Sequence, residues 1–119
     1  PNTSKKYLKR LLNRYGVEIV EDSLEARIIL SKTLSKNLNE VRLYIEMQKR
    51  LKEIIGYREV YDLKDLDIDG NDLIDLGINE GKEIGYILLK VLDLVMENKL
   101  KNKKENIIQY IERMIKWRE

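Results

Sequence analysis

The sequence contains no cysteine and no histidine, and each absence excludes a kind of chemistry. Without cysteine the chain has no disulfide, thiol nucleophile or thiolate metal ligand, which is compatible with a cytoplasmic location. Without histidine it has no imidazole base, no Ser-His-Asp triad and few routes to a zinc site. Catalysis would have to depend on carboxylates or lysine, and no pair of acidic residues stands out as buried.

Proline and long apolar runs are also scarce. The single proline is Pro1, so no helix is interrupted. There is no run of about 18 apolar residues, so we expect no membrane-spanning helix. The polar and basic start lacks the apolar centre of a signal peptide. Since the first residue is not methionine, we expect the chain to be a piece of a longer polypeptide.

What the sequence does contain is typical of a small helical protein. Of its 119 residues, 43% are hydrophobic, enough to fill a core, and 37% are charged, which suits amphipathic helices. Apolar residues recur at spacings of three and four, and strict alternation of apolar and polar residues persists nowhere. We therefore predict an all-α fold, a helical bundle or array of about five to six helices with a turn like that of a helix-hairpin-helix.

Capping residues and glycines place the helices of the first half. Ser4 or Thr3 is expected to cap a helix that ends at Gly16, where a left-handed C-cap fits. A second helix follows directly. The third is expected to start after Asn37, which resembles a capping box together with the glutamate three residues later, and to end at Gly56.

The apolar positions of these helices predict their core-facing sides. Ile29 and Leu30 widen the face of the second helix, so we expect that helix to pack on two sides. The other residues expected to face the core are Leu8, Leu11, Leu12, Tyr15, Val17, Val20, Leu24, Ile28, Leu34, Val41, Tyr44, Ile45, Leu51 and Ile55.

The second half is expected to contain three more helices. A short one ends at Gly77, and Asn79 is expected to cap the next. Asn102 is expected to cap the last helix, with Glu105 as its capping-box partner. Because the pattern becomes unclear after the third helix, we predict two parts: a helical arm over residues 1–56 and a tail domain over residues 57–119. The core positions of the tail are expected to be Ile84, Leu88, Val91, Leu92, Val95, Ile107, Ile111, Met114 and Ile115.

Charge is distributed unevenly along the chain although the formal net charge is only +2. Basic residues concentrate at both ends and acidic residues in the middle, at residues 59–83. If the two ends meet in space, they form a localised site for a polyanion. The alternative interpretation is that these charges are the solvated faces of ordinary helices.

The acidic segment 65–70 matches the first half of an EF-hand calcium loop. The second half does not match, because Asp72 stands where an apolar residue is needed and Leu76 where a bidentate glutamate is needed. The alternative is that these acids cap the following helix and favour its positive end. The sequence therefore predicts no metal site.

The glycine-rich segment 76–82 carries the strongest functional signal. Two helices joined by a tight glycine turn present amide groups and a helix N-terminus to a phosphate, and Lys82 in the first turn adds positive charge. Glu80 and Glu83 act against this. The alternative interpretation is a packing hairpin in which the glycines only cap helices.

The same region resembles a known family. Residues 65–85, which read DLDIDGNDLIDLGINEGKEIG, are similar to the tail segment of bacterial CCA-adding tRNA nucleotidyltransferases and related poly(A) polymerases. Val95 and residues 102–105 continue the likeness, and residues 8–16 resemble the start of the body region of those enzymes. One departure is Ile29-Leu30-Ser31, where the family commonly carries an Ala-Asp pair.

The resemblance implies a C-terminal body and tail region that docks the tRNA elbow and T-arm without catalysis. The head domain of the family holds the catalytic acids, the Mg²⁺ and the ATP or CTP, and nothing here resembles it. The implied partners are tRNA and the head and neck domains of the parent nucleotidyltransferase, with no membrane. The residues predicted to bind RNA are Gly77, Gly81, Lys82, Lys99, Lys101, Lys103, Lys104, Arg10 and Arg14.

Two other functions stay open at this point. One is a helical protein-interaction module with a degenerate calcium loop. The other is a structural arm that mediates dimerisation. The sequence also leaves open whether the parent is a CCA-adding enzyme, an A-adding enzyme or a poly(A) polymerase.

Overall fold

The computed structural model describes residues 4–118, apart from the side chains of residues 35, 117 and 118. Across these residues the chain forms six α-helices and no strand, which confirms the all-α prediction. The helices are α1 (Lys5–Tyr15), α2 (Val17–Leu30), α3 (Leu38–Gly56), α4 (Gly70–Asp75), α5 (Gly81–Met96) and α6 (Lys104–Arg118); a π-helical turn spans Ser31–Ser35 and a 3₁₀ turn spans Leu63–Asp65.

The chain divides into two compact units, Pro1–Tyr61 (unit 1) and Asp62–Glu119 (unit 2). This division lies a few residues beyond Gly56, where the sequence predicts the boundary. In the part that the structure describes, no helix has both the length and the apolar character needed to cross a membrane.

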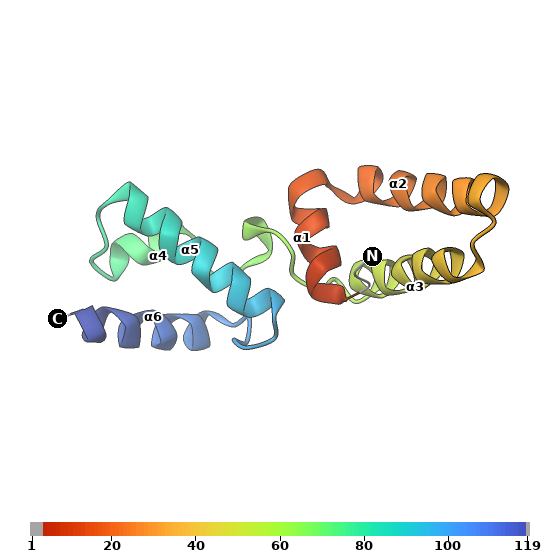
Figure 1. The fold of residues 1–119 in the computed structure, drawn as a ribbon. Coiled ribbons are helices and arrows are strands. Elements are labelled where there is room, and N and C mark those ends of the chain that lie inside the picture. The colour runs from red at the N-terminus through yellow and green to blue at the C-terminus, as the bar shows by residue number, and fades with distance from the viewer. Residues whose placement is uncertain (1–3, 119) are drawn as a thin grey trace. The chain divides into compact units, whose positions relative to one another are not determined.

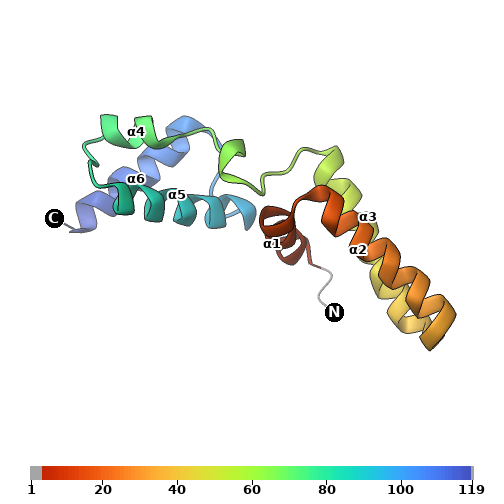
Figure 2. The ribbon, with the colours of Figure 1, turned by 90° about the horizontal axis from the view of Figure 1, so that it is seen from above.

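Unit 1 is a helical hairpin closed at one end. α2 and α3 lie antiparallel and in contact, and α1 packs across the end where α2 begins and α3 finishes (Figure 1). The view from above places α2 directly over α3 (Figure 2). The buried apolar residues of unit 1 include Leu8, Leu12, Val20, Leu24, Ile28, Val41, Tyr44, Met47, Leu51 and Ile54.

The far end of α2 is more exposed than the sequence predicts. Ile29, Leu30 and Leu34 are exposed, with Leu34 at 78%, so the expected packing of α2 on two sides is wrong there. The reason is that α1 covers the beginning of α2, whereas beyond that point α2 packs against α3 on one side. In α3 the predicted stripe is also shifted, because Met47 and Ile54 are buried where Ile45 and Ile55 were expected.

The helix starts and stops of unit 1 agree largely with the predicted caps. The Ser4 side chain caps α1 by accepting a hydrogen bond from the Tyr7 amide at 3.2 Å; Thr3 lies outside the described residues. Asn37 Oδ1 accepts from the first-turn amides of α3, as predicted. The prediction of a capping box is wrong, because the Glu40 carboxylate accepts a hydrogen bond from the Tyr44 hydroxyl at 3.2 Å.

Gly16 forms a sharp corner between α1 and α2. It has φ +86° and ψ 164°, so its φ is positive as predicted but its ψ lies outside the left-handed helical region. This part of backbone space is essentially restricted to glycine. The Gly16 amide donates to the Leu12 carbonyl, and its own carbonyl accepts from Val20, so one residue ends the first helix and starts the second.

A buried lysine holds α1 against the segment that follows α3. Lys9 is only 2% exposed, and its ammonium lies 3.1 Å from Glu59, which Lys5 also contacts at 3.0 Å. Lys5 pairs with Glu53 as well, at 3.0 Å. Desolvation is the largest single effect on the pKa of Glu59 and raises it, but the hydrogen bonds and charges of Lys5 and Lys9 together hold this pKa below its usual value. Lys5 and Lys9, two basic residues of the N-terminal segment, are therefore paired with acidic residues within unit 1.

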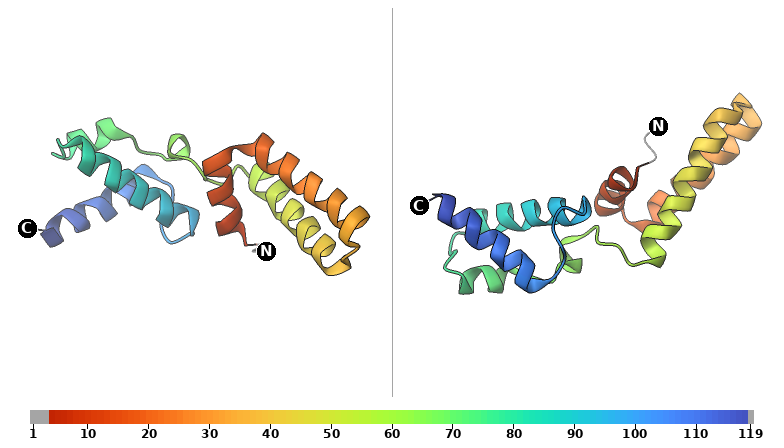
Figure 3. Two further views of the ribbon diagram at one scale, coloured as in Figure 1. Left: turned by 45° about the horizontal axis from the view of Figure 1, so that its top comes forward. Right: turned by 90° about the horizontal axis from the view of Figure 1, so that it is seen from below.

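Unit 2 contains α4, α5 and α6, which two further views show from other sides (Figure 3). α4 packs against α5, and Gly70 lies close to Ile84, where an added Cβ would be 3.6 Å from its Cγ2. The predicted core positions Val91, Leu92, Val95, Ile107 and Ile111 are buried. The remaining buried apolar residues of this unit are Leu66, Ile68, Leu73, Ile78, Ile87 and Met96.

Candidate nucleic-acid interface

The glycine hairpin between α4 and α5 begins at Gly77, the residue after the C-cap Leu76 of α4. Gly77 has φ +95°, its amide donates to the Ile74 carbonyl at 2.9 Å, and the Ile78 amide donates to Leu73 at 3.0 Å. These two bonds define a Schellman motif, which needs a residue of positive φ at this position. The amide of Gly77 is thus engaged inside the turn, and the main contribution of this residue is to shape the hairpin.

The N-terminus of α5 faces outward without a side-chain cap. The helix begins at Gly81 with Glu80 at its N-cap, one residue later than the predicted cap at Asn79. Because no side chain caps it, the first-turn amides of Gly81 and Lys82 are available to solvent or to an anion. Lys82 is exposed and forms no ion pair with any described residue. Glu80 and Glu83 line the same hollow as Lys82, so an anion would meet opposing charges here.

The acidic segment before α4 acts as a set of helix caps. Asp69 and Asp72 form a reciprocal capping box at the start of α4, which confirms the capping interpretation of these acids. Asp67 accepts from the Lys104 amide at 2.8 Å and so caps the distant helix α6. Within residues 4–118 no three acidic side chains come together as metal ligands, and the calcium interpretation gains no support.

Asn102 does not cap α6 as predicted. Its side chain accepts from the Asp67 amide and donates to the Asp65 carbonyl, both at 2.9 Å. It therefore ties the connection between α5 and α6 to the acidic segment. Glu105 consequently has no capping box to complete, because the cap of α6 comes from Asp67.

Two of the predicted RNA-binding lysines are paired with acids in unit 2. Lys104 lies 3.0 Å from Asp72, and Lys99 lies 3.2 Å from Glu97. The hydrogen bond to Asp72 raises the pKa of Lys104. The pKa of Asp72 is lowered, first by the hydrogen bond from the Asp69 amide and then by Lys104. In unit 2 the acidic middle of the sequence is thus in direct contact with its second basic end.

The other predicted lysines are not gathered at one point. Lys101 and Lys103 are exposed and form no ion pair among the described residues, like Lys82. Lys82 is in the first turn of α5, whereas Lys99 follows its end, and a helix of 16 residues is about 24 Å long. The hairpin and the α5–α6 connection are therefore separate places on unit 2.

The formal charge differs in sign between the two units. Unit 1 has 13 lysines and arginines against 8 acidic residues, a charge of +5. Unit 2 has 10 lysines and arginines against 13 acidic residues, a charge of −3. Positive charge is thus concentrated on the unit that carries only two of the predicted residues, Arg10 and Arg14.

Those two residues belong to a basic row on the outer side of α1. Lys6, Arg10 and Arg14 are exposed and follow one another at a spacing of four, so they share one side of the helix. The Arg14 guanidinium also lies over the Tyr15 ring, 5.5 Å from its centre.

Sequence reasoning missed two further rows. Arg42, Lys49 and Lys52 are exposed on one side of α3 and form no ion pair within the described residues. On α5, Lys82 is followed at spacings of four by Tyr86, which is 58% exposed, and by exposed Lys90. The spacing of these residues was readable in the sequence. The sequence did not show which of these charges form ion pairs.

Comparison with known proteins identifies the family of this domain. Residues 4–111 match the family model described as tRNA nucleotidyltransferase domain 2. No curated protein and no solved structure matches the chain significantly. The match covers nearly the whole chain and includes every segment on which the resemblance was based. The chain therefore belongs to the tRNA nucleotidyltransferase domain 2 family and corresponds to a C-terminal body region of that family.

Proposed function

We propose that this domain docks tRNA at the elbow and T-arm for a parent nucleotidyltransferase and does not itself catalyse nucleotide addition. Family membership supports a role in tRNA metabolism. The observation that carries the proposal is the charge of +5 on unit 1, with exposed basic rows on α1 and α3. Such rows suit the phosphates of an RNA backbone and carry no means of reading bases.

Within this proposal we give the individual residues different weights. Arg10 and Arg14 on α1, together with Arg42, Lys49 and Lys52 on α3, provide most of the attraction for phosphate. On unit 2, Gly81 and Lys82 offer amides and one ammonium, and Lys101 and Lys103 add charge without an acidic partner. Gly77 shapes the hairpin, while Lys99 and Lys104 contribute less because they are already paired.

Docking of this kind contributes to catalysis by orientation. A-form RNA is recognised mainly through its shape, phosphates and 2′-hydroxyl groups, so a domain of fixed shape can bind many tRNAs alike. Holding the tRNA body would fix the position of the 3′ end relative to a separate active site. The parent would be a cytoplasmic enzyme that adds nucleotides to RNA, either CCA-adding, A-adding or a poly(A) polymerase.

The residues present do not fit the Mg²⁺ and nucleotide that the parent enzyme would use. No acidic triad converges in the described residues, and Asp67, Asp69 and Asp72 accept capping hydrogen bonds. We therefore assign metal and nucleotide chemistry to a head domain of the parent and derive no step through it here.

A salt titration tests the proposal. The chain is titrated with unmodified tRNA at several salt concentrations, and the logarithm of affinity should fall linearly with the logarithm of salt concentration. Replacing both Arg10 and Arg14 by glutamate should weaken binding at least tenfold at low salt. The matched control is Lys116→Glu on α6, which reverses a charge outside every row. Binding that does not vary with salt, or a control as damaging as the double variant, would refute the proposal.

A further inference from the structure

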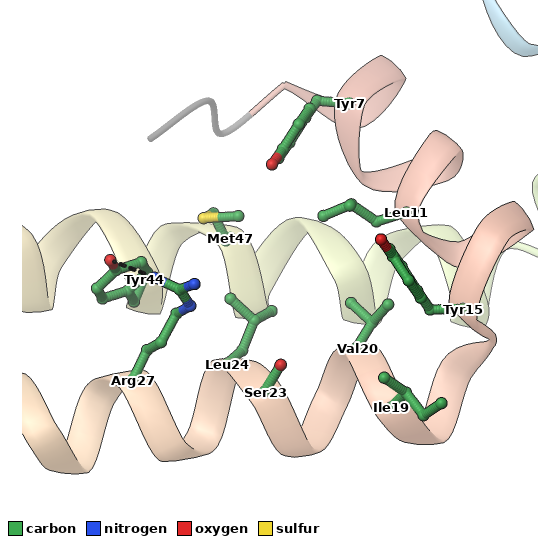
Figure 4. Close-up of a pocket in the computed structure, with 10 residues that line it drawn as sticks. All are labelled: Tyr7, Leu11, Tyr15, Ile19, Val20, Ser23, Leu24, Arg27, Tyr44 and Met47. Atoms are coloured by element: carbon green, nitrogen blue, oxygen red, sulfur yellow. Dashed lines mark hydrogen bonds between the residues drawn. The ribbon is translucent and has the colours of Figure 1, made fainter.

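Unit 1 contains a groove between its three helices that the backbone-docking function does not use. One wall is a row on α1 formed by Tyr7, Leu11 and Tyr15 (Figure 4). The facing wall is a row on α2 formed by Ile19, Ser23 and Arg27. Each row repeats at a spacing of four, so each presents one straight side of its helix to the other.

The inside of the groove is apolar and the rim is polar. Leu24 and Met47 form its floor, while the hydroxyl groups of Tyr15 and Ser23 point into the open space (Figure 4). Two aromatic rings on one wall, above an apolar floor, provide flat surfaces on which another planar ring can stack. Polar groups at the rim can then orient such a ring.

Arg27 supplies a positive charge at one end of the groove. Its guanidinium donates to the Tyr44 hydroxyl at 3.3 Å and lies 5.8 Å from the centre of the Tyr44 ring. It forms no ion pair within the described residues, so its other N–H groups have no carboxylate partner there. Glu40 contacts this pair from α3, because its carboxylate accepts a hydrogen bond from the Tyr44 hydroxyl.

Three of the four acids of α2 lie away from the groove. Glu18, Glu21 and Glu25 occupy the side of the helix roughly opposite the row containing Arg27, since each residue is rotated by about 100° from the last. The fourth, Asp22, is exposed between that side and the row. Arg14, which covers the Tyr15 ring, adds a second positive charge at the rim. The groove is therefore complementary to a ligand that combines a flat ring with an anionic group.

We propose that this groove binds one unstacked nucleotide of RNA, with its base against Tyr7 and Tyr15 and its phosphate on Arg27. The cavity volume of about 270 Å³ is just below the range of roughly 300–1,000 Å³ that is typical of drug-sized ligands, which suits a single base. Aromatic stacking and arginine contacts are how unpaired nucleotides are commonly held. The inference rests on the proposed function and adds a preference for unpaired RNA.

The test compares two RNAs with the full chain. One is a blunt RNA duplex, and the other is the same duplex with a short single-stranded extension. The extension should raise the affinity about 5- to 150-fold, the range measured for stacking one base on an aromatic side chain. In an NMR titration the resonances of Tyr7 and Tyr15 should shift with the extended RNA and not with the blunt one.

Three variants locate the effect. Arg27→Gln should lower the gain from the extension about tenfold, as expected for loss of a charged hydrogen bond to phosphate. Ser23→Phe places a ring in the groove from an exposed position, so it should abolish the gain while the melting temperature stays unchanged. Arg42→Gln, on the outer side of α3, is the matched control and should weaken both RNAs equally.

The outcomes separate this inference from the proposed function. Salt-dependent binding of the blunt duplex without any gain from the extension would overturn the groove and leave backbone docking intact. A gain that survives both Arg27→Gln and Ser23→Phe would also overturn it, because the unpaired nucleotide would then bind elsewhere. Failure of both RNAs to bind at low salt would refute the proposed function itself.

Discussion

The contact between Lys9 and Glu59 allows a quantitative test of how unit 1 is held together. The Glu59 side chain is 22% exposed, and its carboxylate contacts the ammonium groups of both Lys5 and the buried Lys9. Removing its charge therefore deprives both lysines of this ionic partner. Breaking a buried ion pair by removing one partner costs about 3–5 kcal/mol. Because Glu59 is partly exposed, we expect Glu59→Gln to lower the free energy of unfolding by about 2–3 kcal/mol at pH 7.

The matched control is Glu46, a glutamate within α3. Glu46 pairs with Arg50 four residues later at 3.3 Å, and both side chains are more than a third exposed. Exposed helix pairs contribute only about 0.3–0.5 kcal/mol, so Glu46→Gln should cost no more than that. Both free energies are measured by urea unfolding followed by circular dichroism. Equal costs for the two variants would refute the view that burial of Lys9 makes the Glu59 contact strong.

The same contact predicts how stability changes with pH. The pKa of Glu59 is lowered in the folded chain from its ordinary value of 4.5, so the stabilisation from this group is complete above that value. It is lost as the pH falls through the lower folded pKa. The difference between the original chain and Glu59→Gln should therefore be constant near pH 7 and should shrink below about pH 4.5. A difference that is unchanged at pH 3 would contradict this assignment.

Three further predictions concern the backbone, a cap and the exposed tip. Gly16→Ala should lower the free energy of unfolding by about 1–3 kcal/mol because of the strained φ and ψ, whereas Gly56→Ala should be harmless, as judged by urea unfolding. Asp67→Ala should cost about 1 kcal/mol and should increase amide hydrogen exchange in the first turn of α6, and unchanged exchange would exclude the cap. Leu34→Gln should change the melting temperature by less than the equivalent of about 0.5 kcal/mol, because this side chain is 78% exposed; a larger loss would show hidden packing.

Features of the fold that depend on neighbouring residues could be predicted from the sequence. Ser4 and Asn37 cap the helices that follow them, and Gly16 and Gly77 end helices, because each acts on amides or carbonyls within a few residues. The all-α class follows from the same local spacing. The predicted capping box at Asn37 failed at its second residue. Glu40 accepts a hydrogen bond from the Tyr44 hydroxyl, four residues ahead.

Features that join distant segments could not be predicted in this way. Asp67 and Asn102 are 35 residues apart, and no local pattern shows that one side chain binds the other's backbone. In the sequence Lys9 belongs to the basic N-terminal segment, yet in the structure it is buried against Glu59, 50 residues later. For the candidate site this means that the positions of the lysines were predictable, whereas their ion pairs had to be seen in the structure.

The bond between Asn102 and the segment before α4 has a consequence for biosynthesis. Unit 1 is complete once residue 61 has left the ribosome, so it can fold while the rest is still being made. The acidic segment must wait for Asn102 and Lys104, the residues that hold it in place. Until then Asp67 and Asp72 lack their contacts with Lys104, and a nascent chain stalled before residue 102 should be an early target for proteases.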